Sequence, residues 1–440
     1  MIGDKDGYGL LDPNFGSDWN RKCAVTIDNT KVSGAANLTD FPVLLTEDNL
    51  PSEMFDADGS YPARSDGGDI RFSSDIDGDT ELAREVVEFT INNDPASGTA
   101  QIWVKVPTLD HDDDTIIYVW YNAPSETEPA RDATYGMEAV WDSGYTFVHH
   151  LEESSGNAID STENTNDGTY DGNLPDNIAG KISDGQDMDG SGDYLYTSGY
   201  KGVLGQNSWT ISCWIKLDAN NGALFNWGKN QIGGKIMLDI NTDGKIHIDN
   251  NGNSMSGNST DLADGNYHLV HATFSGTTRI AGINFYKDGS GETETRADNY
   301  NLNLVTDKDV YLGYNIMGDI NPLNGIMDEA RMYAGELSSD WIATEYANQN
   351  APADFSEAGT PSDVVPPDTC TAPTDTFWQM DLQDHCTTTV STYSDYGMEC
   401  YNPIGGSWVI GANTEVRRGS STNCLPQIEG TGVFSIQPIH

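Results

Sequence analysis

Carboxylates in loops rich in glycine and asparagine are the residues of this sequence best suited to chemistry, and that chemistry is calcium binding. They gather in residues 75–79, 160–168 and 184–193. Carboxylate and carbonyl oxygens on tight turns are the ligands that Ca²⁺ prefers. In the first run Gly78 stands at position 4, and Val86 stands at position 12, where an EF-hand loop carries a bidentate Glu. We therefore interpret residues 75–79 as a β-turn, which leaves residues 160–168 and 184–193 as candidate calcium loops.

Paired carboxylates could also hydrolyse a glycosidic bond, which requires a separation of about 5–5.5 Å for retention or about 6.5–9.5 Å for inversion. Asp328 and Glu329 are adjacent in a predicted strand, so their side chains should point to opposite faces. The sequence has no Gly-x-Ser-x-Gly nucleophile motif and no Walker or dinucleotide glycine motif. The pairs His149-His150 and His268…His271 are typical of strands with one buried histidine. We therefore predict that the protein is not an enzyme.

A sugar site would combine an aromatic ring, which stacks on the apolar face of the sugar, with amides that bind its hydroxyls. Trp227 lies in the segment Leu224-Phe-Asn-Trp-Gly228, with Asn226 beside it and Asn230 three residues later. These three residues form the candidate ligand-binding group. The alternative is that Trp227 packs against its own sheet and belongs to the core.

Four of the six cysteines lie close together near the end of the chain: Cys370, Cys386, Cys400 and Cys424. Their spacing contains no Cys-x-x-Cys and no Cys-His pattern suited to zinc, so two disulfides in an oxidising compartment are favoured. The three possible pairings stay open. The hydrophobic core of so short a segment is small, and closing a loop of about 15 residues contributes roughly 3 kcal/mol.

Charge and composition limit the partners of this protein. Against 22 Lys and Arg there are 69 Asp and Glu, which gives a formal net charge of −47. Such a field repels phosphate backbones and anionic lipid headgroups, so we expect neither nucleic acid nor a membrane surface as a partner. No window approaches the roughly 18 apolar residues of a membrane span, so no membrane insertion is expected. The 37% of hydrophobic residues suffice for sizeable cores.

Strands must position these residues, because short apolar or alternating runs recur roughly every ten residues with turn residues between them. One helical pattern is convincing, at residues 338–348, and proline-rich composition marks the linkers. We predict an all-β fold with two β-sandwich domains in tandem and a small disulfide-stapled β-rich C-terminal domain. The expected parts are an N-terminal extension (1–16), a first sandwich (17–124), a linker (125–134), a second sandwich (135–349), a proline-rich linker (350–367) and a Cys-rich domain (368–440).

Five motifs follow one another in the first sandwich. They are Trp19-Asn-Arg-Lys-Cys-Ala-Val-Thr-Ile-Asp28, Phe41-Pro-Val-Leu-Leu45, Gly68-Asp-Ile-Arg-Phe72, Ile102-Trp-Val-Lys-Val-Pro107 and Thr115-Ile-Ile-Tyr-Val-Trp-Tyr121. Their order and spacing resemble domain of unknown function 2341, a β-sandwich family of large surface and secreted proteins. This resemblance implies an architecture and no activity.

Five further motifs follow in the second sandwich. They are Trp209-Thr-Ile-Ser-Cys-Trp-Ile-Lys216, Asp264-Gly-Asn-Tyr-His-Leu-Val-His-Ala-Thr-Phe274, Asn284-Phe-Tyr-Lys-Asp-Gly289, Val310-Tyr-Leu-Gly-Tyr314 and Gly325-Ile-Met-Asp-Glu-Ala-Arg-Met-Tyr333. Their order is similar to that of the laminin-G-like, concanavalin-A-like jelly rolls. Tyr267 stands where that family usually has Trp, and Cys213 where a small residue is usual; both are expected in the core. The resemblance also places residues 184–193 just before a core strand, so we interpret them as a solvated turn.

The same resemblance suggests a metal site. In jelly rolls of this kind, a loop such as residues 160–168 often lies near the Asp of the late Gly-x-x-Asp-Glu strand, which is Asp328 here. It therefore implies a structural Ca²⁺ held by Asp160, Asn166 and Asp328. The alternative is an Asx-rich turn and a strand-end carboxylate with a backbone partner. The hydrolases of this superfamily carry Glu-x-Asp-x-(x)-Glu, and no acidic cluster of the sequence fits that pattern.

These features predict a non-catalytic surface protein for adhesion or carbohydrate binding, with structural Ca²⁺ and with glycans or a surface polysaccharide as partners. The alternative is a structural subunit of an extracellular filament, fibre or virion decoration, held by contacts with copies of itself or with other subunits. A glycoside hydrolase is a minor alternative. If Met1 is the native start, the missing signal favours the virion surface, whereas a cleaved leader favours an extracellular or cell-surface location.

Overall fold

Strands form nearly all of the regular structure. The computed structural model describes residues 19–171, 176–251, 254–296, 301–318 and 321–364, together with six short strands between residues 378 and 417. The described residues from 20 to 362 form one compact unit, and those from 363 onward belong to a second. Among the described residues, one helix, α1 (Ser339–Asn350), is longer than four residues. The all-β class predicted from the sequence is confirmed.

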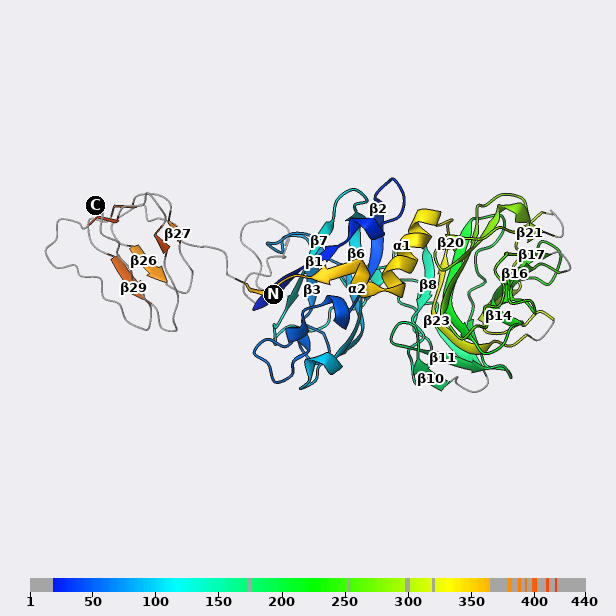
Figure 1. The fold of residues 1–440 in the computed structure, drawn as a ribbon, viewed down its shortest axis with the longest axis horizontal. Helices are drawn as coiled ribbons and strands as arrows, with labels where there is room; N and C mark the ends of the chain where they lie inside the picture. The colour runs from blue at the N-terminus through cyan, green and yellow to red at the C-terminus, as the bar shows by residue number, and fades with distance from the viewer. Residues whose placement is uncertain are drawn as a thin grey trace. The chain divides into compact units, whose positions relative to one another are not determined.

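The first sandwich, drawn mainly in blue and cyan in Figure 1, consists of two antiparallel sheets. One sheet has the order β24-β1-β7-β3-β4 and the other has the order β2-β6-β5. Along β1, Cys23, Val25 and Ile27 face the core and the intervening residues are partly exposed, as the two-residue period of a strand requires. The elements are β1 (Arg21–Ile27), η1 (Asn29–Lys31), β2 (Leu38–Thr46), η2 (Glu47–Asn49), η3 (Ser52–Phe55), β3 (Arg71–Ser73), β4 (Glu81–Leu82), β5 (Arg84–Thr90), η4 (Pro95–Ser97), β6 (Thr99–Leu109) and β7 (Thr115–Tyr121).

The second sandwich contains two sheets of eight strands each, in the orders β10-β11-β23-β13-β18-β19-β20, with β8 paired to β23, and β21-β17-β16-β15-β14-β22-β12-β9. Their inner faces enclose one apolar core that includes Cys213, as expected. The elements are η5 (Met137–Ala139), β8 (Tyr145–His149), β9 (Gly168–Asp171), β10 (Asp176–Ala179), β11 (Asp184–Asp189), β12 (Tyr194–Thr197), β13 (Trp209–Leu217), β14 (Gly222–Gly228), β15 (Lys235–Ile240), β16 (Ile246–Asp249), β17 (Ser254–Ser256), β18 (His268–Phe274), η6 (Ile280–Gly282), β19 (Ile283–Lys287), β20 (Ser290–Gly291), β21 (Thr295–Arg296), β22 (Lys308–Leu312) and β23 (Asn324–Tyr333).

The two sheets of the second sandwich have different surroundings. The sheet that contains β13 faces the first sandwich, because Trp214 of β13 and Leu269 of β18 share an apolar cluster with Leu44 and Trp103 of the first sandwich. We call this the closed sheet. The sheet that contains β14 and β22 lies on the far side, and we call it the open sheet (Figure 1).

Aromatic and charged side chains together fill the interface between the sandwiches. Trp103 and Trp141 lie with ring centroids 5.5 Å apart, and the Arg331 guanidinium sits 4.5 and 5.0 Å from the two rings. Glu85 of β5 accepts hydrogen bonds from Trp141 Nε1 at 2.8 Å and from Ser161 Oγ at 2.6 Å. The two sandwiches therefore share buried contacts and form one unit.

The chain returns to the first sandwich after the second one is complete. Residues 350–367 were predicted to be a linker, and that prediction is wrong for residues 352–358, which form α2 (Pro352–Phe355) and β24 (Ser356–Ala358). Strand β24 pairs with β1 in the register Thr26↔Glu357, and Phe355 is fully buried in the first core. Proline composition suggested a linker, but Pro352 occupies the first turn of a helix, where its missing N–H costs nothing.

The second unit is described only by short strands after β25 (Ser362–Asp363). They form three parallel pairs, β26–β29, β27–β30 and β28–β31. Their bounds are β26 (Trp378–Asp381), β27 (Thr387–Thr388), β28 (Thr392–Tyr393), β29 (Met398–Tyr401), β30 (Val409–Ile410) and β31 (Val416–Arg417). Cys400 lies in β29, and the other three cysteines of the predicted disulfides, Cys370, Cys386 and Cys424, lie outside the described residues. The disulfides stay a prediction.

Candidate functional site

Four half-buried tyrosines cluster on the outer face of the open sheet. Tyr194 and Tyr196 belong to β12, Tyr311 belongs to β22, and Tyr314 lies two residues after the end of β22. In β12 and β22 the residues between them are buried, so the period of two turns the tyrosines outward. Tyr196 and Tyr311 are direct cross-strand partners. We call these four residues the tyrosine surface.

The rings of the tyrosine surface form a continuous group. Tyr196 and Tyr311 are stacked with centroids 5.5 Å apart, and Tyr194 and Tyr314 are stacked with centroids 5.0 Å apart. Tyr194 also lies 5.8 Å from Tyr311, which joins the two pairs. Offset and tilted aromatic contacts of this kind stabilise one another by roughly 0.5–1.5 kcal/mol each. The rings therefore hold one another in place and present a fixed aromatic surface.

Polar groups border this surface. The Tyr194 hydroxyl donates to Asp171 Oδ2 at 2.5 Å, and this hydrogen bond raises the pKa of Tyr194. Burial, with Asp309 nearby, raises the pKa of Tyr311. Asp309 itself pairs with Lys201, with 2.6 Å between Oδ1 and Nζ. The phenols of Tyr194 and Tyr311 therefore stay neutral at physiological pH, and the carboxylate oxygens of Asp171 and Asp309 lie beside them.

A loop after β22 covers the neighbouring part of the open sheet and is held by two predicted site residues. Asn226 donates through Nδ2 to the backbone oxygen of Tyr314, and Asn230 donates through Nδ2 to the backbone oxygen of Met317 at 2.6 Å. Asn226 is fully buried, whereas Asn230 is exposed. Both amides thus hold the backbone of the segment that carries Tyr314.

Trp227 belongs to the core, which is the alternative given for it above, and it cannot serve as the stacking residue. Its side chain is fully buried, its Nε1 donates to the backbone oxygen of Val203 at 2.9 Å, and its ring meets Trp209 edge to face at 5.4 Å. A ring enclosed on every side cannot stack on a ligand. The reason lies in the strand period, because Phe225 and Trp227 both point into the core of the sandwich.

The sequence carried a signal for the tyrosine surface. Tyr194 and Tyr196 alternate with Leu195 and Thr197, and Tyr311 stands between Val310 and Leu312. Alternation of this kind predicts one buried and one exposed face. The order of the strands across the sheet, however, is not encoded in that alternation, so the sequence alone does not bring residue 196 next to residue 311.

The predicted calcium ligands Asp160 and Asn166 lie together, but their contacts are hydrogen bonds within the protein. Asp160 is fully buried, and its Oδ1 accepts from the N–H groups of Val148 at 3.0 Å and Thr162 at 2.9 Å. Its Oδ2 accepts from the hydroxyl of Thr162 at 2.9 Å and from the N–H of Asn166 at 2.7 Å. The Asn166 side chain donates to the backbone oxygen of Thr146. Four donors already surround this carboxylate, as the alternative of an Asx-rich turn requires.

Asp328, the third predicted ligand, lies in the closed sheet. Its Oδ2 accepts from the backbone N–H groups of Lys181 at 2.8 Å and Ile182 at 2.9 Å, while its Oδ1 is buried without a hydrogen-bond partner. Burial, with Glu329 nearby, raises the pKa of Asp328 well above its usual range. A buried carboxyl whose Oδ2 is held by backbone donors agrees with the alternative given above, and the calcium site stays a prediction.

Asp328 and Glu329 do not point to opposite faces, contrary to the expectation for adjacent strand residues. Trp214 pairs with Asp328 and Ser212 pairs with Arg331, so β23 carries one extra residue at this point. Glu329 has a φ of 51°, which marks a β-bulge. The bulge turns Glu329 toward the interface, on the same side as its ion-pair partner Arg331. Bulges depend on strand pairing and are not visible in the sequence.

The two carboxylates are enclosed by a network of buried charges. Glu329 Oε1 lies 2.8 Å from His150 Nδ1 and accepts from Gln101 Nε2 at 2.7 Å. Arg331 bridges Glu329 at 2.6 Å and Glu345 of α1 at 2.7 Å. Burial opposes the charged form of His150, but Glu329 and Glu85 raise its pKa well above the usual range. These groups contact one another across the interface, so their arrangement suits the joining of two domains.

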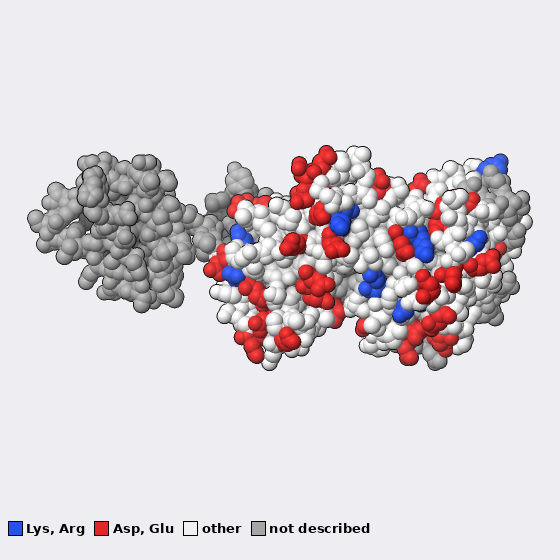
Figure 2. All heavy atoms as spheres, viewed as in Figure 1, with Lys and Arg blue, Asp and Glu red and all other residues white. Residues whose placement is uncertain are grey.

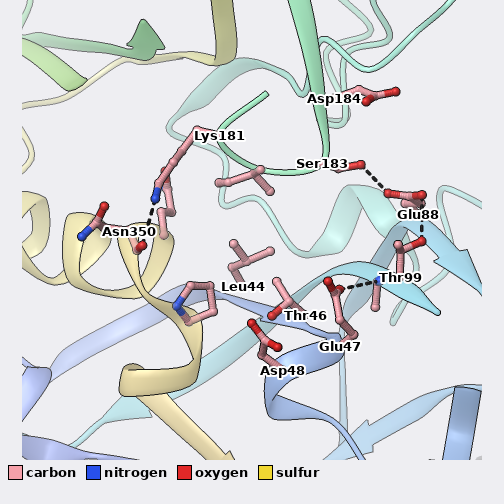
Figure 3. A pocket seen from close by; sticks show the side chains of 14 residues that line it. Leu44, Thr46, Glu47, Asp48, Glu88, Thr99, Lys181, Ser183, Asp184 and Asn350 are labelled. Carbon is pink, nitrogen blue, oxygen red and sulfur yellow. Dashed lines mark hydrogen bonds between the residues drawn. The ribbon is translucent and has the colours of Figure 1, made fainter. Parts of the chain in front are cut away.

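A cleft of about 370 Å³ opens at the edge of this interface (Figure 3). Glu47, Glu88 and Lys181 line it, and most of their polar groups are already used. Glu88 accepts from Thr99 Oγ1 at 2.9 Å and from Ser183 Oγ, and Lys181 Nζ donates to the backbone oxygen of residue 350 at 2.9 Å. The cleft is therefore a polar seam between the sandwiches.

A surface turn brings three metal-ligating side chains together among the described residues. Atoms of Asp110, His111 and Asp112 lie within 4.8 Å of one another. His111 Nδ1 lies 2.7 Å from Asn37 Oδ1, and Asp110 Oδ1 accepts the N–H of Asp112 at 2.9 Å. The sequence analysis did not select this turn.

Among the described residues, no helix is long and apolar enough to cross a membrane.

Two family models match the chain in the predicted order. Residues 66–166 match Domain of unknown function (DUF2341), and residues 189–343 match the Concanavalin A-like lectin/glucanases superfamily in its Laminin_G_3 form. The recognition of both families from sequence motifs is confirmed. The first match begins at residue 66, inside the predicted first sandwich (17–124), and extends beyond it over the segment that carries Trp141 and His150 and packs against it. No curated protein sequence matches the chain.

Solved structures resemble part of the chain. Domain 4 of an extracellular GH43 arabinanase from Geobacillus stearothermophilus, in complex with arabinotriose, is 19% identical over 46% of this chain and 98% of that domain, with a TM-score of 0.36. The binding domain of botulinum neurotoxin serotype D is 15% identical over 49% of this chain and 53% of that one, with a TM-score of 0.34. The chain thus spans about half the length of the toxin domain, and the likenesses carry no argument about function.

Proposed function

We propose that the protein is a non-catalytic, extracellular or surface protein that binds carbohydrate through the tyrosine surface of its second sandwich. The observation that carries this proposal is the contiguous group of four half-exposed tyrosine rings on the open sheet. A contiguous group of exposed aromatic side chains belongs to an interaction site more often than it arises by chance.

The chemistry of this surface suits a sugar. A pyranose or furanose ring presents C–H groups on its faces, which pack on aromatic rings, and hydroxyls on its edge, which need hydrogen-bond partners. The tyrosine surface offers both, because Asp171 and the phenol hydroxyls lie at the margin of the rings. The match of residues 189–343 to a superfamily that includes lectins supports the same class of ligand.

Paired alanine substitutions test the proposal. Tyr196→Ala together with Tyr311→Ala removes one stacked pair, and we expect carbohydrate binding to be weaker by roughly 5- to 150-fold, since each aromatic contact is worth roughly 0.5–1.5 kcal/mol. Binding is measured on a glycan array and then by affinity electrophoresis in gels that contain the polysaccharides found. The matched control is Tyr118→Ala, a partly exposed tyrosine on β7 of the first sandwich.

Two outcomes would reject the proposal. The first is wild-type protein that binds no glycan of a broad array. The second is glycan binding that the double variant retains in full while self-association of the protein is lost, because the tyrosines would then mediate contacts between copies. That second result would support the alternative of a structural subunit.

A further inference from the structure

We infer that the tyrosine surface selects uncharged glycans and rejects those that carry carboxylates or sulfates. This inference rests on the proposed function and adds the class of ligand. It comes from the charged groups that border the rings and from the charge of the whole chain.

Asp171 supplies the first observation. It pairs with Tyr194 in the register between β9 and β12, so both residues stand in one row on the outer face of the open sheet. Its Oδ2 is fixed 2.5 Å from the Tyr194 hydroxyl, and Asp171 is exposed. A sugar hydroxyl can donate to this carboxylate, whereas a uronate or sulfate laid on the same ring would face a like charge. At close range in water such a charge pair costs a factor of roughly five in affinity.

Asp309 supplies the second observation, at the other side of the rings. It lies on β22 two residues before Tyr311, and it contributes to the raised pKa of that tyrosine, as Asp171 does. The cation beside it, Lys201, already forms an ion pair with Asp309 at 2.6 Å. An anionic sugar would have to break this pair to reach the lysine. The surface therefore offers hydrogen-bond acceptors to a ligand and no ready anion site from Lys201.

The charge of the whole chain acts in the same direction. With 69 Asp and Glu against 22 Lys and Arg, the net charge is −47, and Figure 2 shows acidic side chains spread over the face in view with fewer basic ones among them. This field is screened beyond about 8 Å at physiological salt. The carboxylates beside the rings therefore act at physiological salt as well, and the wider field adds to the rejection of polyanions at low salt.

Polysaccharides matched in backbone and differing in charge test the inference. Hydroxyethylcellulose is compared with carboxymethylcellulose, and galactan with polygalacturonate, together with the neutral and uronate-bearing members of a glycan array. We expect the neutral member of each bound pair to bind at least fivefold more tightly at about 20 mM NaCl, and the ratio to shrink at about 500 mM, because the Debye length falls. Asp171→Asn keeps an acceptor for Tyr194 and removes the charge. It should therefore also reduce the ratio of the affinity for the neutral member to the affinity for the acidic member.

A charge-matched control separates the local effect from the net charge. Asp58→Asn changes an exposed aspartate of the first sandwich by the same unit of charge, and the ratio should stay at the wild-type value. Equal or tighter binding of the acidic member by wild-type protein would overturn the inference and leave the proposed function standing. If no neutral or acidic glycan binds at all, the proposed function falls, and the inference falls with it. An unchanged ratio in Asp171→Asn would overturn the role of Asp171.

Discussion

The closed and open sheets of the second sandwich belong to one fold but differ in their outer polar side chains. The closed sheet buries these side chains, whereas the open sheet leaves them half-exposed. On the closed sheet, Glu329, Arg331 and their partners are almost fully buried and bind groups of the same chain. On the open sheet, four phenols stay half-exposed, with stacking partners and with carboxylates beside them. The comparison teaches that the closed sheet uses buried ion pairs to join two domains, whereas the open sheet leaves aromatic groups half-exposed, as the proposed function requires.

The largest effect should follow from opening the buried network. Arg331→Met leaves Glu329 and Glu345 without their shared cation, and removing one partner of a buried ion pair costs about 3–5 kcal/mol. We expect a loss of that size in the free energy of unfolding, measured by urea denaturation, with both sandwiches affected together because Arg331 also contacts Trp103 and Trp141.

The tyrosine variants provide the contrast to this result. Tyr196→Ala removes a half-exposed ring and should lower the free energy of unfolding by less than about 1.5 kcal/mol while it weakens glycan binding. Arg331→Lys, which keeps the charge without the fork of donors, should lie between wild type and Arg331→Met. A stability loss in Tyr196→Ala as large as that in Arg331→Met would break the distinction between the two sheets.

A second effect concerns a carboxyl near the closed sheet. Burial raises the pKa of Glu152 to about 9, and Glu329 and Asp328 are among the charges nearby. Between pH 4.5 and 9 the folded state therefore holds a proton that the unfolded state has lost, so the stability falls as pH rises. Glu152→Gln removes the titrating group and with it this loss of stability at high pH. We expect the substitution to stabilise the protein by roughly 1–3 kcal/mol at pH 8 and by far less at pH 5.

Melting curves across pH measure this difference. The control is Glu163→Gln, which removes an exposed carboxyl and should leave the shape of the pH dependence unaltered. If Glu152→Gln were equally stabilising at pH 5 and pH 8, titration would not be the cause, and the closed sheet would hold an ionised Glu152.

Sequence order and alternation predicted much of the fold, and pairing between strands explains what they missed. The ordered motifs around Trp209 and Gly325 identified the second sandwich, and its β-structure is as expected. The side-chain direction of Glu329 was predicted wrongly because a bulge is a property of two paired strands. The sequence left Trp227 open between a sugar site and the core, because its exposure depends on which face of β14 the core covers. The return of β24 to β1 joins residues more than 300 apart, and no local pattern encodes such a pairing.

The smallest effect should come from the removal of calcium. The Asp160 carboxylate already accepts hydrogen bonds from the N–H groups of Val148, Thr162 and Asn166. A metal ion bound at Asp160 would have to displace these groups. We therefore expect EDTA to leave the melting temperature of the second sandwich unchanged. Asp160→Ala should lower it with or without EDTA, because each buried donor left unpaired costs roughly 1–3 kcal/mol. A melting temperature that rises with added Ca²⁺ in wild type, and does not rise in Asp160→Ala, would restore the calcium site predicted from the sequence and would mean that the closed side of the domain also depends on a ligand from outside the chain.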